Sequence, residues 1–168
     1  LDIKTKRLHI RRFTESDITE EYISWLNDKE LMRYSEQRHQ EHTSETSKKY
    51  LLSFFGTPNF FLALDTREGE MIGTITIYQD IHNKICDIGV LIGLPRSRGK
   101  GFGFEAWDSV ISWTELNLEP RKITAGAMSE NQSMLKLMEK SNMQEDGRRK
   151  GYYLLDGKSV DLIVMSLN

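Results

Sequence analysis

Residues 88–103 read IGVLIGLPRSRGKGFG, and this stretch decides the fold. Its first half is an apolar run that is typical of a buried strand and ends before a proline. Its second half alternates glycine with larger residues at Gly99, Gly101 and Gly103, and a helix-type pattern follows. We therefore expect a strand, a glycine-rich loop and a helix in direct succession.

The glycine loop is expected to bind an anion. Because glycine has no Cβ, several backbone N–H groups can approach one ligand closely where a helix begins. The helix N-terminus contributes roughly half a positive charge, and Arg96, Arg98 and Lys100 add positive potential. Phosphate is the anion that suits this arrangement best; a turn whose glycines only permit helix packing is the alternative.

The spacing of the glycines excludes two common nucleotide motifs. A P-loop needs four residues between its glycines, but five lie between Gly93 and Gly99, and Gly101 stands where a magnesium-binding hydroxyl belongs. The dinucleotide fingerprint needs a third glycine where this chain has Phe104, and the strand before the loop does not belong to a βαβ unit near the N-terminus. Neither motif describes this loop.

The loop instead resembles the Gln/Arg-x-x-Gly-x-Gly/Ala motif of the GNAT superfamily of N-acetyltransferases, with Arg98, Gly101 and Gly103 at the defined positions. The resemblance extends over almost the whole chain. It includes the opening Thr5-x-Arg7-Leu8 with Asp17, the apolar strand 88–94, the helix start at Asn131 and Ser133, and the closing hairpin. These features resemble the subgroup of ribosomal-protein N-terminal (alanine/serine) acetyltransferases.

Hydrophobic periodicity and turn residues predict seven strands and four helices. The strands are expected at 7–13, 60–64, 71–78, 85–94, 122–128, 148–155 and 159–165, the last two around an Asp156-Gly157 turn. The helices are expected after the capping residues 14–17, from 43 to 56, through 104–118, and from 131 to a left-handed Asn142. This pattern predicts an α+β fold, and the resemblance implies a mixed, mostly antiparallel sheet of about seven strands with helices on both faces and a splayed fourth strand that holds acyl-CoA.

Composition favours a small-molecule enzyme over other classes. The chain has 168 residues, a net charge of −2 and 38% hydrophobic residues, which suits a single domain over 1–168 and no nucleic-acid or membrane partner. No apolar run approaches the roughly 20 residues of a membrane span. The lone cysteine, Cys86, lies in an apolar run and excludes an internal disulfide, so a reducing, cytoplasmic location is expected.

The resemblance implies acetyl-CoA as co-substrate, with no metal. Backbone groups of the splayed strand would pair with the pantetheine arm, the glycine loop would hold the pyrophosphate, and the start of the fourth helix would touch the cofactor. The implied cofactor residues are Leu91, Ile92, Gly93, Leu94, Arg98, Gly99, Lys100, Gly101, Phe102, Gly103 and Asn131. Gly93 also suits a bulge or a close ligand approach on general grounds, with a simple kink as the alternative.

The catalytic groups are harder to identify than the cofactor loop. The family often uses an acidic residue at the position of Asp87 as the base, and His82 is a second candidate. Many members protonate the leaving thiolate with a tyrosine at the position where this chain has Met138. Ser133 could replace that acid, although a serine near a helix start can also serve only as a cap.

The segment between the first strand and the hairpin shapes the acceptor site in relatives. Here it is mixed polar and aromatic, and the acceptor residues expected from it are Trp25, Tyr34, Glu36, Arg38 and His39. The expected function is transfer of acetyl from acetyl-CoA to a primary amine, such as a protein N-terminus, an amino-sugar nucleotide, a polyamine or an amino-acid-like amine. One alternative is a non-catalytic acyl-CoA-binding module. Another is a nucleotide-binding switch, against which the failed P-loop spacing argues. A homodimer is one option for assembly.

Overall fold

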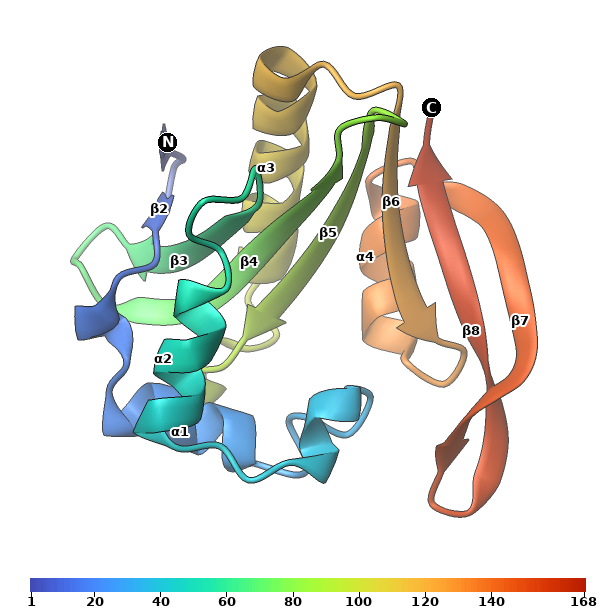
Figure 1. Ribbon diagram of the computed structural model, residues 1–168, viewed down its shortest axis with the longest axis horizontal. Coiled ribbons are helices and arrows are strands. Elements are labelled where there is room, and N and C mark those ends of the chain that lie inside the picture. Colours follow the sequence, from blue (N-terminus) through green and yellow to red (C-terminus); the bar gives the residue numbers. More distant parts are fainter.

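One sheet and four α-helices make up the protein, whose residues 1–168 are all described by a computed structural model (Figure 1). The strands are β1 (Asp2–Lys4), β2 (Leu8–Arg12), β3 (Phe60–Thr66), β4 (Met71–Asp80), β5 (Ile85–Ile92), β6 (Lys122–Met128), β7 (Gln144–Leu155) and β8 (Lys158–Leu167). The helices are α1 (Glu20–Asn27), α2 (Ser44–Leu52), α3 (Phe102–Leu118) and α4 (Gln132–Lys140). Three short 3-10 helices, η1 (Glu15–Asp17), η2 (Glu36–His39) and η3 (Pro95–Ser97), complete the chain.

The strands lie in the order β1-β2-β3-β4-β5-β6-β8-β7. All neighbours are antiparallel except β5 and β6, which are parallel because α3 lies between them in the chain and returns it to the same edge. The Asp156-Gly157 turn has positive φ at both residues, as a two-residue hairpin turn requires. No helix is long and apolar enough to cross a membrane.

The mixed, mostly antiparallel sheet confirms the predicted fold class, and two local predictions are wrong. The sheet has eight strands instead of seven, because the three-residue β1 pairs with β2 and is too short to show a sequence period. The residues 14–17 do not cap α1: Glu15–Asp17 form η1 with Thr14 as its N-cap, and Asp17 accepts hydrogen bonds from the Arg11 guanidinium at 2.8 and 2.9 Å. Thr19 is the residue that caps α1, accepting from Tyr22 N–H at 3.1 Å.

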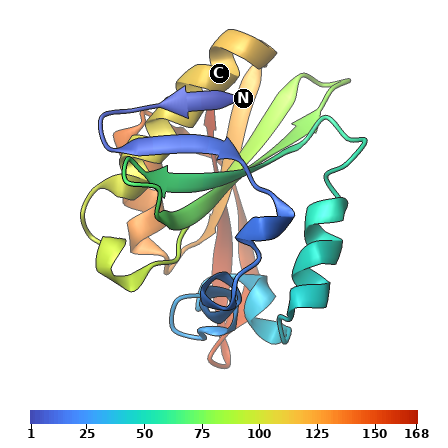
Figure 2. The same ribbon diagram turned by 90° about the vertical axis from the view of Figure 1, so that its left-hand side faces the viewer.

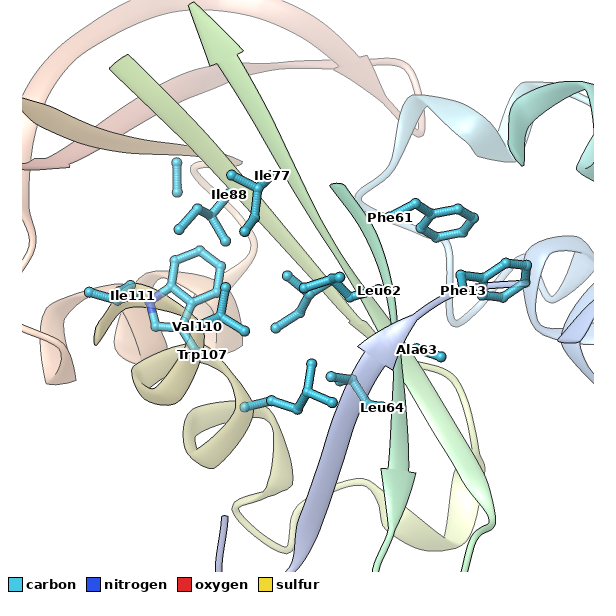
Figure 3. Packing of buried hydrophobic residues seen from close by; sticks show 14 of the residues in the cluster. Phe13, Phe61, Leu62, Ala63, Leu64, Ile77, Ile88, Trp107, Val110 and Ile111 are labelled. Atoms are coloured by element: carbon cyan, nitrogen blue, oxygen red, sulfur yellow. The ribbon is translucent and has the colours of Figure 1, made fainter. Parts of the chain in front are cut away.

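Helices cover both faces of the sheet, as Figure 2 shows for α2 on one side and α3 on the other. Alternate residues of β3 serve the two layers: Leu62 and Leu64 face Trp107 of α3, while Phe61 stacks on Phe13 with ring centroids 4.3 Å apart (Figure 3). Trp107 is fully buried, and its indole N–H donates to Ser141 Oγ at 3.1 Å, which ties α3 to the end of α4.

Two glycines, Gly73 and Gly93, permit close contacts at the end of β5. An added Cβ at Gly73 on β4 would lie 2.2 Å from the carbonyl oxygen of Leu91, so only glycine lets these two strands approach so closely. An added Cβ at Gly93 would lie 2.1 Å from Cδ2 of Trp25. The space beside Gly93, where a close ligand approach was expected, is filled by the indole ring of α1, which packs on the backbone where β5 stops.

Gly93→Ala is expected to lower the free energy of unfolding by about 1–3 kcal/mol, because the new methyl group must displace a buried indole. Urea unfolding checks this. Gly147→Ala is the matched control, since a Cβ there meets nothing within 4 Å, and it should change stability by no more than about 0.5 kcal/mol. If Trp25→Leu failed to reduce the cost of Gly93→Ala in a double-mutant cycle, this packing account would be wrong.

Candidate active site

The strands β5 and β6 separate and leave a cleft between them. They pair only through Ile85–Asp87 and Lys122–Thr124. Beyond this point β5 continues along β4 and β6 continues along β8, and the two diverge (Figure 1). A cleft of about 770 Å³ occupies the gap and is lined by β5, the glycine loop, the start of α4 and residues 30–35. The splayed strand implied by the sequence resemblance is therefore β5.

The cleft side of β5 carries backbone groups that no neighbouring strand occupies. Gly93 N–H donates to the Ile72 carbonyl oxygen at 2.9 Å, and hydrogen bonding alternates along an antiparallel strand. By that alternation Leu91 points its N–H and C=O toward β4, while Val90 and Ile92 point theirs into the gap. Val90 was not among the expected cofactor residues; counting back two residues from Ile92, which was expected, would have found it.

The glycine loop lines the same cleft. Gly99 and Gly101 have φ of +71° and +82°, a region that favours glycine, and Gly101 is the N-cap of α3. The N–H groups of the first turn of α3 have no partner within the helix and face the end of the cleft lined by Phe102 and Gly103. This arrangement suits an anionic group.

Most of the expected cofactor residues meet at the cleft. Those that line it are Leu91, Ile92, Arg98, Gly99, Gly101, Phe102, Gly103 and Asn131. Lys100 is exposed outside it. Gly93 and Leu94 lie outside it as well, and their N–H groups both donate to the Ile72 carbonyl oxygen, at 2.9 and 3.2 Å.

An arginine from the N-terminal segment holds the glycine loop in place. The Arg7 guanidinium donates to Glu105 Oε2 at 2.6 Å and to the Lys100 carbonyl oxygen at 2.8 Å, and it lies 4.2 Å from the Phe102 ring centroid. Thr5 Oγ1 and Arg7 N–H both donate to Glu105 Oε1, at 2.6 and 2.8 Å. Burial raises the pKa of Glu105, but the hydrogen bonds from Thr5 and Arg7 outweigh this and leave the pKa below its ordinary value.

A second pocket of about 310 Å³ lies beyond β5, between the sheet and helices α1 and α2. It shares Ser35, Gly89, Val90 and Leu91 with the large cleft. Two ligands could therefore meet at the same short stretch of β5, one from each side. Sequence reasoning missed the strand residues Thr74 and Thr76 in this pocket, although their period-two spacing on β4 was a usable signal.

Asp87 lies two residues before this meeting point, at the last pair between β5 and β6. Its carboxylate accepts a hydrogen bond from Thr124 Oγ1 at 2.7 Å. Burial raises the pKa of Asp87, and the Thr124 hydrogen bond offsets this only in part. The carboxylate faces a recess of about 330 Å³ that Tyr34 and Glu36 also line. The other candidate base, His82, is exposed in the β4–β5 turn, at the opposite end of β5 from the cleft.

The start of α4 presents a free hydroxyl to the cleft. Asn131 caps the helix, since its Oδ1 accepts from Met134 N–H at 3.2 Å. Ser133 lines the cleft and its hydroxyl makes no hydrogen bond within the chain, so it is not used as a cap. Met138, at the position where the sequence resemblance implies a tyrosine, is fully buried in the core and does not line the cleft.

The five expected acceptor residues are spread over several places. Tyr34 lines both the cleft and the recess, and Glu36 lines the recess. The Arg38 guanidinium donates to the carbonyl oxygens of Ser35 and Leu154, each at 2.9 Å, and so fastens η2 to the β7–β8 hairpin. His39 is exposed and pairs with Glu36 at 3.1 Å, while Trp25 is buried against Gly93.

Comparison with known proteins identifies the relatives of this chain. The family described as "Acetyltransferase (GNAT) domain" matches residues 7–144. The N-acetyltransferase 9-like protein of Caenorhabditis briggsae is 29% identical over 72% of this chain and 66% of its own length. The ribosomal protein uS5-alanine N-acetyltransferase of Escherichia coli is 27% identical over 67% of this chain and 58% of its own length. This chain thus spans less than two thirds of the length of these curated relatives.

Solved structures share the fold. An acetyltransferase (GNAT family) from Bacillus anthracis has a TM-score of 0.84 at 23% identity, covering 99% of this chain and 98% of its own. The spermidine N-acetyltransferase of Vibrio cholerae, solved with CoA and spermine, has a TM-score of 0.85 at 16% identity, covering 97% of this chain and 96% of its own.

Glu105→Gln is expected to lower the free energy of unfolding by about 1–2 kcal/mol at pH 7, because charged hydrogen bonds to Arg7 and Thr5 are weakened. A carboxylate whose folded pKa is depressed stabilises the fold above its ordinary pKa of 4.5, and this contribution is lost as the pH falls through the lower folded value. The difference between variant and wild type should therefore vanish in acid. Urea unfolding at pH 7 and at a pH below the folded pKa of Glu105 tests this, with the exposed Glu115→Gln of the same helix as a control. An equal loss of unfolding free energy at the two pH values would contradict it.

Proposed function

This chain belongs to the GNAT acetyltransferase family, and from that premise we propose that it transfers acetyl from acetyl-CoA to a primary amine by direct attack. The observation that carries the proposal is the meeting of two cavities at Gly89, Val90 and Leu91. The large cleft is suited to the thioester and the smaller pocket to the amine. We further propose that residues 1–168 act as one catalytic domain in the cytoplasm, with a homodimer as one option for assembly.

The residues of the cleft suit an acyl-CoA. The first-turn amides of α3 and the Arg98 side of the loop suit its pyrophosphate. The inward N–H and C=O groups of Val90 and Ile92 suit the amides of a pantetheine arm, which pairs with a strand edge as another strand does. When bound, acetyl-CoA supplies a thioester whose acetyl group goes to the amine and whose sulfur leaves as the thiol.

The chain's own groups have three tasks in such a transfer. A backbone N–H at the free edge of β5, from Val90 or Ile92, stabilises negative charge on the carbonyl oxygen. Asp87 receives the amine proton through water, since its carboxylate faces the neighbouring recess. The Ser133 hydroxyl, which has no partner within the chain, returns a proton to the departing sulfur directly or through water.

The basicity of the amine decides how much help the base must give. Holding a lysine-like amine in its neutral form at pH 7 costs about 4–5 kcal/mol, whereas an α-amine with a pKa near 8 costs about 1.4 kcal/mol. A carboxylate acting through water is adequate for the second kind of amine. The buried Met138, in place of the usual tyrosine acid, favours the alternative of a non-catalytic acyl-CoA-binding module.

Gly101→Glu is expected to abolish acetyl-CoA binding, because its side chain and negative charge enter the site proposed for the pyrophosphate. Isothermal titration with CoA measures this. Gly69→Glu is the matched control, since Gly69 also has a positive φ of +91° but lies in the β3–β4 turn, outside the cleft. Normal CoA binding by Gly101→Glu would refute the assignment of the loop.

Asp87→Asn is expected to lower kcat about 10²–10⁴-fold with little change in the KM for acetyl-CoA, as loss of a general base does. In the wild type the base form is lost as the pH falls through a pKa raised above the usual 3.8, so activity should decline on the acid side there. A pH series of thiol release measures both. An unchanged kcat in Asp87→Asn would show that Asp87 is not the base. Thr124→Val removes the hydrogen bond that lowers the pKa of Asp87, so it should only shift the acid-side decline in activity to higher pH.

A further inference from the structure

The pocket between the sheet and helices α1 and α2 carries no fixed charge. None of the residues that line it is Asp, Glu, Lys or Arg. The carboxylates of Asp87 and Glu36 line the separate recess, and Glu30 lines the large cleft. A polyamine buries several ammonium groups, which need carboxylate partners to leave water. This pocket cannot supply them.

Hydroxyl groups line much of the pocket instead. They come from Thr74 and Thr76 on β4, from Ser47 and Tyr50 on α2, and from Tyr22 on α1. His42 is the other titratable residue of the lining, and its Nε2 already lies 2.9 Å from the Gln37 carbonyl oxygen. Such a lining suits an uncharged polar ligand, which it can bind through hydrogen bonds between neutral groups.

Ser47 is the sharpest sign that a polar ligand enters. Its side chain is 4% exposed, and its Oγ has no hydrogen-bond partner. A buried hydroxyl left without a partner costs about 1–3 kcal/mol. Ser47 lines the pocket, so rotation of its hydroxyl about the Cα–Cβ bond would bring it to a ligand hydroxyl there.

Aromatic rings form part of the pocket wall. Phe61 of β3 and Tyr50 of α2 meet edge to face, with centroids 5.2 Å apart, and Tyr22 lies on the adjacent helix. Tyr50 Oη also lies 2.7 Å from Tyr78 Oη, which fixes the orientation of its ring. Aromatic faces together with hydroxyls bind compact rings that carry both C–H and O–H groups, which is the chemistry of a sugar.

We propose that the acceptor is a primary amine of the amino-sugar class, whose polyhydroxylated, otherwise uncharged ring lies in this pocket with its amine at the wall formed by Gly89, Val90 and Leu91. The inference rests on the proposed acetyl transfer and narrows its substrate. The electron-withdrawing oxygens of such a ring lower the basicity of the amine toward that of an α-amine, which suits a pocket without a carboxylate. A pocket of about 310 Å³ holds one hexose-sized ring.

The first experiment compares acceptors. Thiol release from acetyl-CoA is measured with glucosamine, a nucleotide-linked amino sugar, a serine-initiated peptide and spermidine. We expect kcat/KM for at least one amino sugar to exceed that for spermidine and the peptide by 10-fold or more, and the two sugar arms show whether the nucleotide is required. A preference for spermidine or the peptide would overturn the inference and leave acetyl transfer standing. CoA binding without thiol release for any amine would overturn both.

The second experiment tests Ser47 as a specificity residue. Ser47→Ala should raise KM for the preferred amino sugar about 10-fold while leaving the KM for acetyl-CoA unchanged, and its thermal stability should stay equal or rise because an unsatisfied hydroxyl is removed. Ser44→Ala, at an exposed position of the same helix, is the matched control. Thr76→Asp places a carboxylate in the pocket and should raise kcat/KM for spermidine relative to the amino sugar. An unchanged acceptor KM in Ser47→Ala, or no change in preference in Thr76→Asp, would contradict the proposed occupant.

Discussion

The loss of pairing between β5 and β6 after Asp87 and Thr124 is the constraint on which the rest of the molecule depends. A continuous parallel pair would satisfy every backbone group of β5, and the sheet would have no cleft. Because the strands diverge, Val90 and Ile92 keep N–H and C=O groups that no strand occupies. An unpaired strand edge can pair with an extended, amide-bearing ligand as another strand would.

Two sets of contacts keep the edge in position. At the end of β5, the indole of Trp25 occupies the space beside Gly93, and the Arg98 guanidinium donates to the Gly93 carbonyl oxygen at 2.9 Å. At the start of α3, Arg7 and Glu105 hold the glycine loop through the Lys100 carbonyl oxygen. The strand end and the loop are thus fixed independently, which places the free strand edge and the first-turn amides along one cleft.

Local patterns predicted most of the secondary structure and the place of the glycine loop between a strand and a helix. Alternation, caps and the Asp156-Gly157 turn are properties of neighbouring residues, so they can be read without a fold. β1 is missed because three residues show no period. The pattern places the helix caps at 14–17 because no local signal shows that Asp17 pairs with Arg11, which lies on another element.

The acceptor side was less predictable for the same reason. Arg38 and Trp25 are residue types that often bind ligands. In the folded protein they instead contact Leu154 and Gly93, which lie far away in the sequence. Nothing in the sequence distinguishes Ser47 and Thr74 from other polar residues; they line one pocket because helix α2 packs over the sheet. Whether a hydroxyl lacks a hydrogen-bond partner, or a pocket lacks charged residues, depends on the tertiary structure and not on any sequence motif.

Hydrogen exchange of the Val90 and Ile92 amides, followed by NMR with and without CoA, tests the central claim most directly. The account predicts that both amides exchange fast in the free protein, while the Gly89 and Leu91 amides, which face β4, are protected. Adding CoA should slow Val90 or Ile92 substantially and leave Leu91 little changed. Strong protection of Val90 and Ile92 without CoA, or exchange that CoA does not alter, would contradict the account.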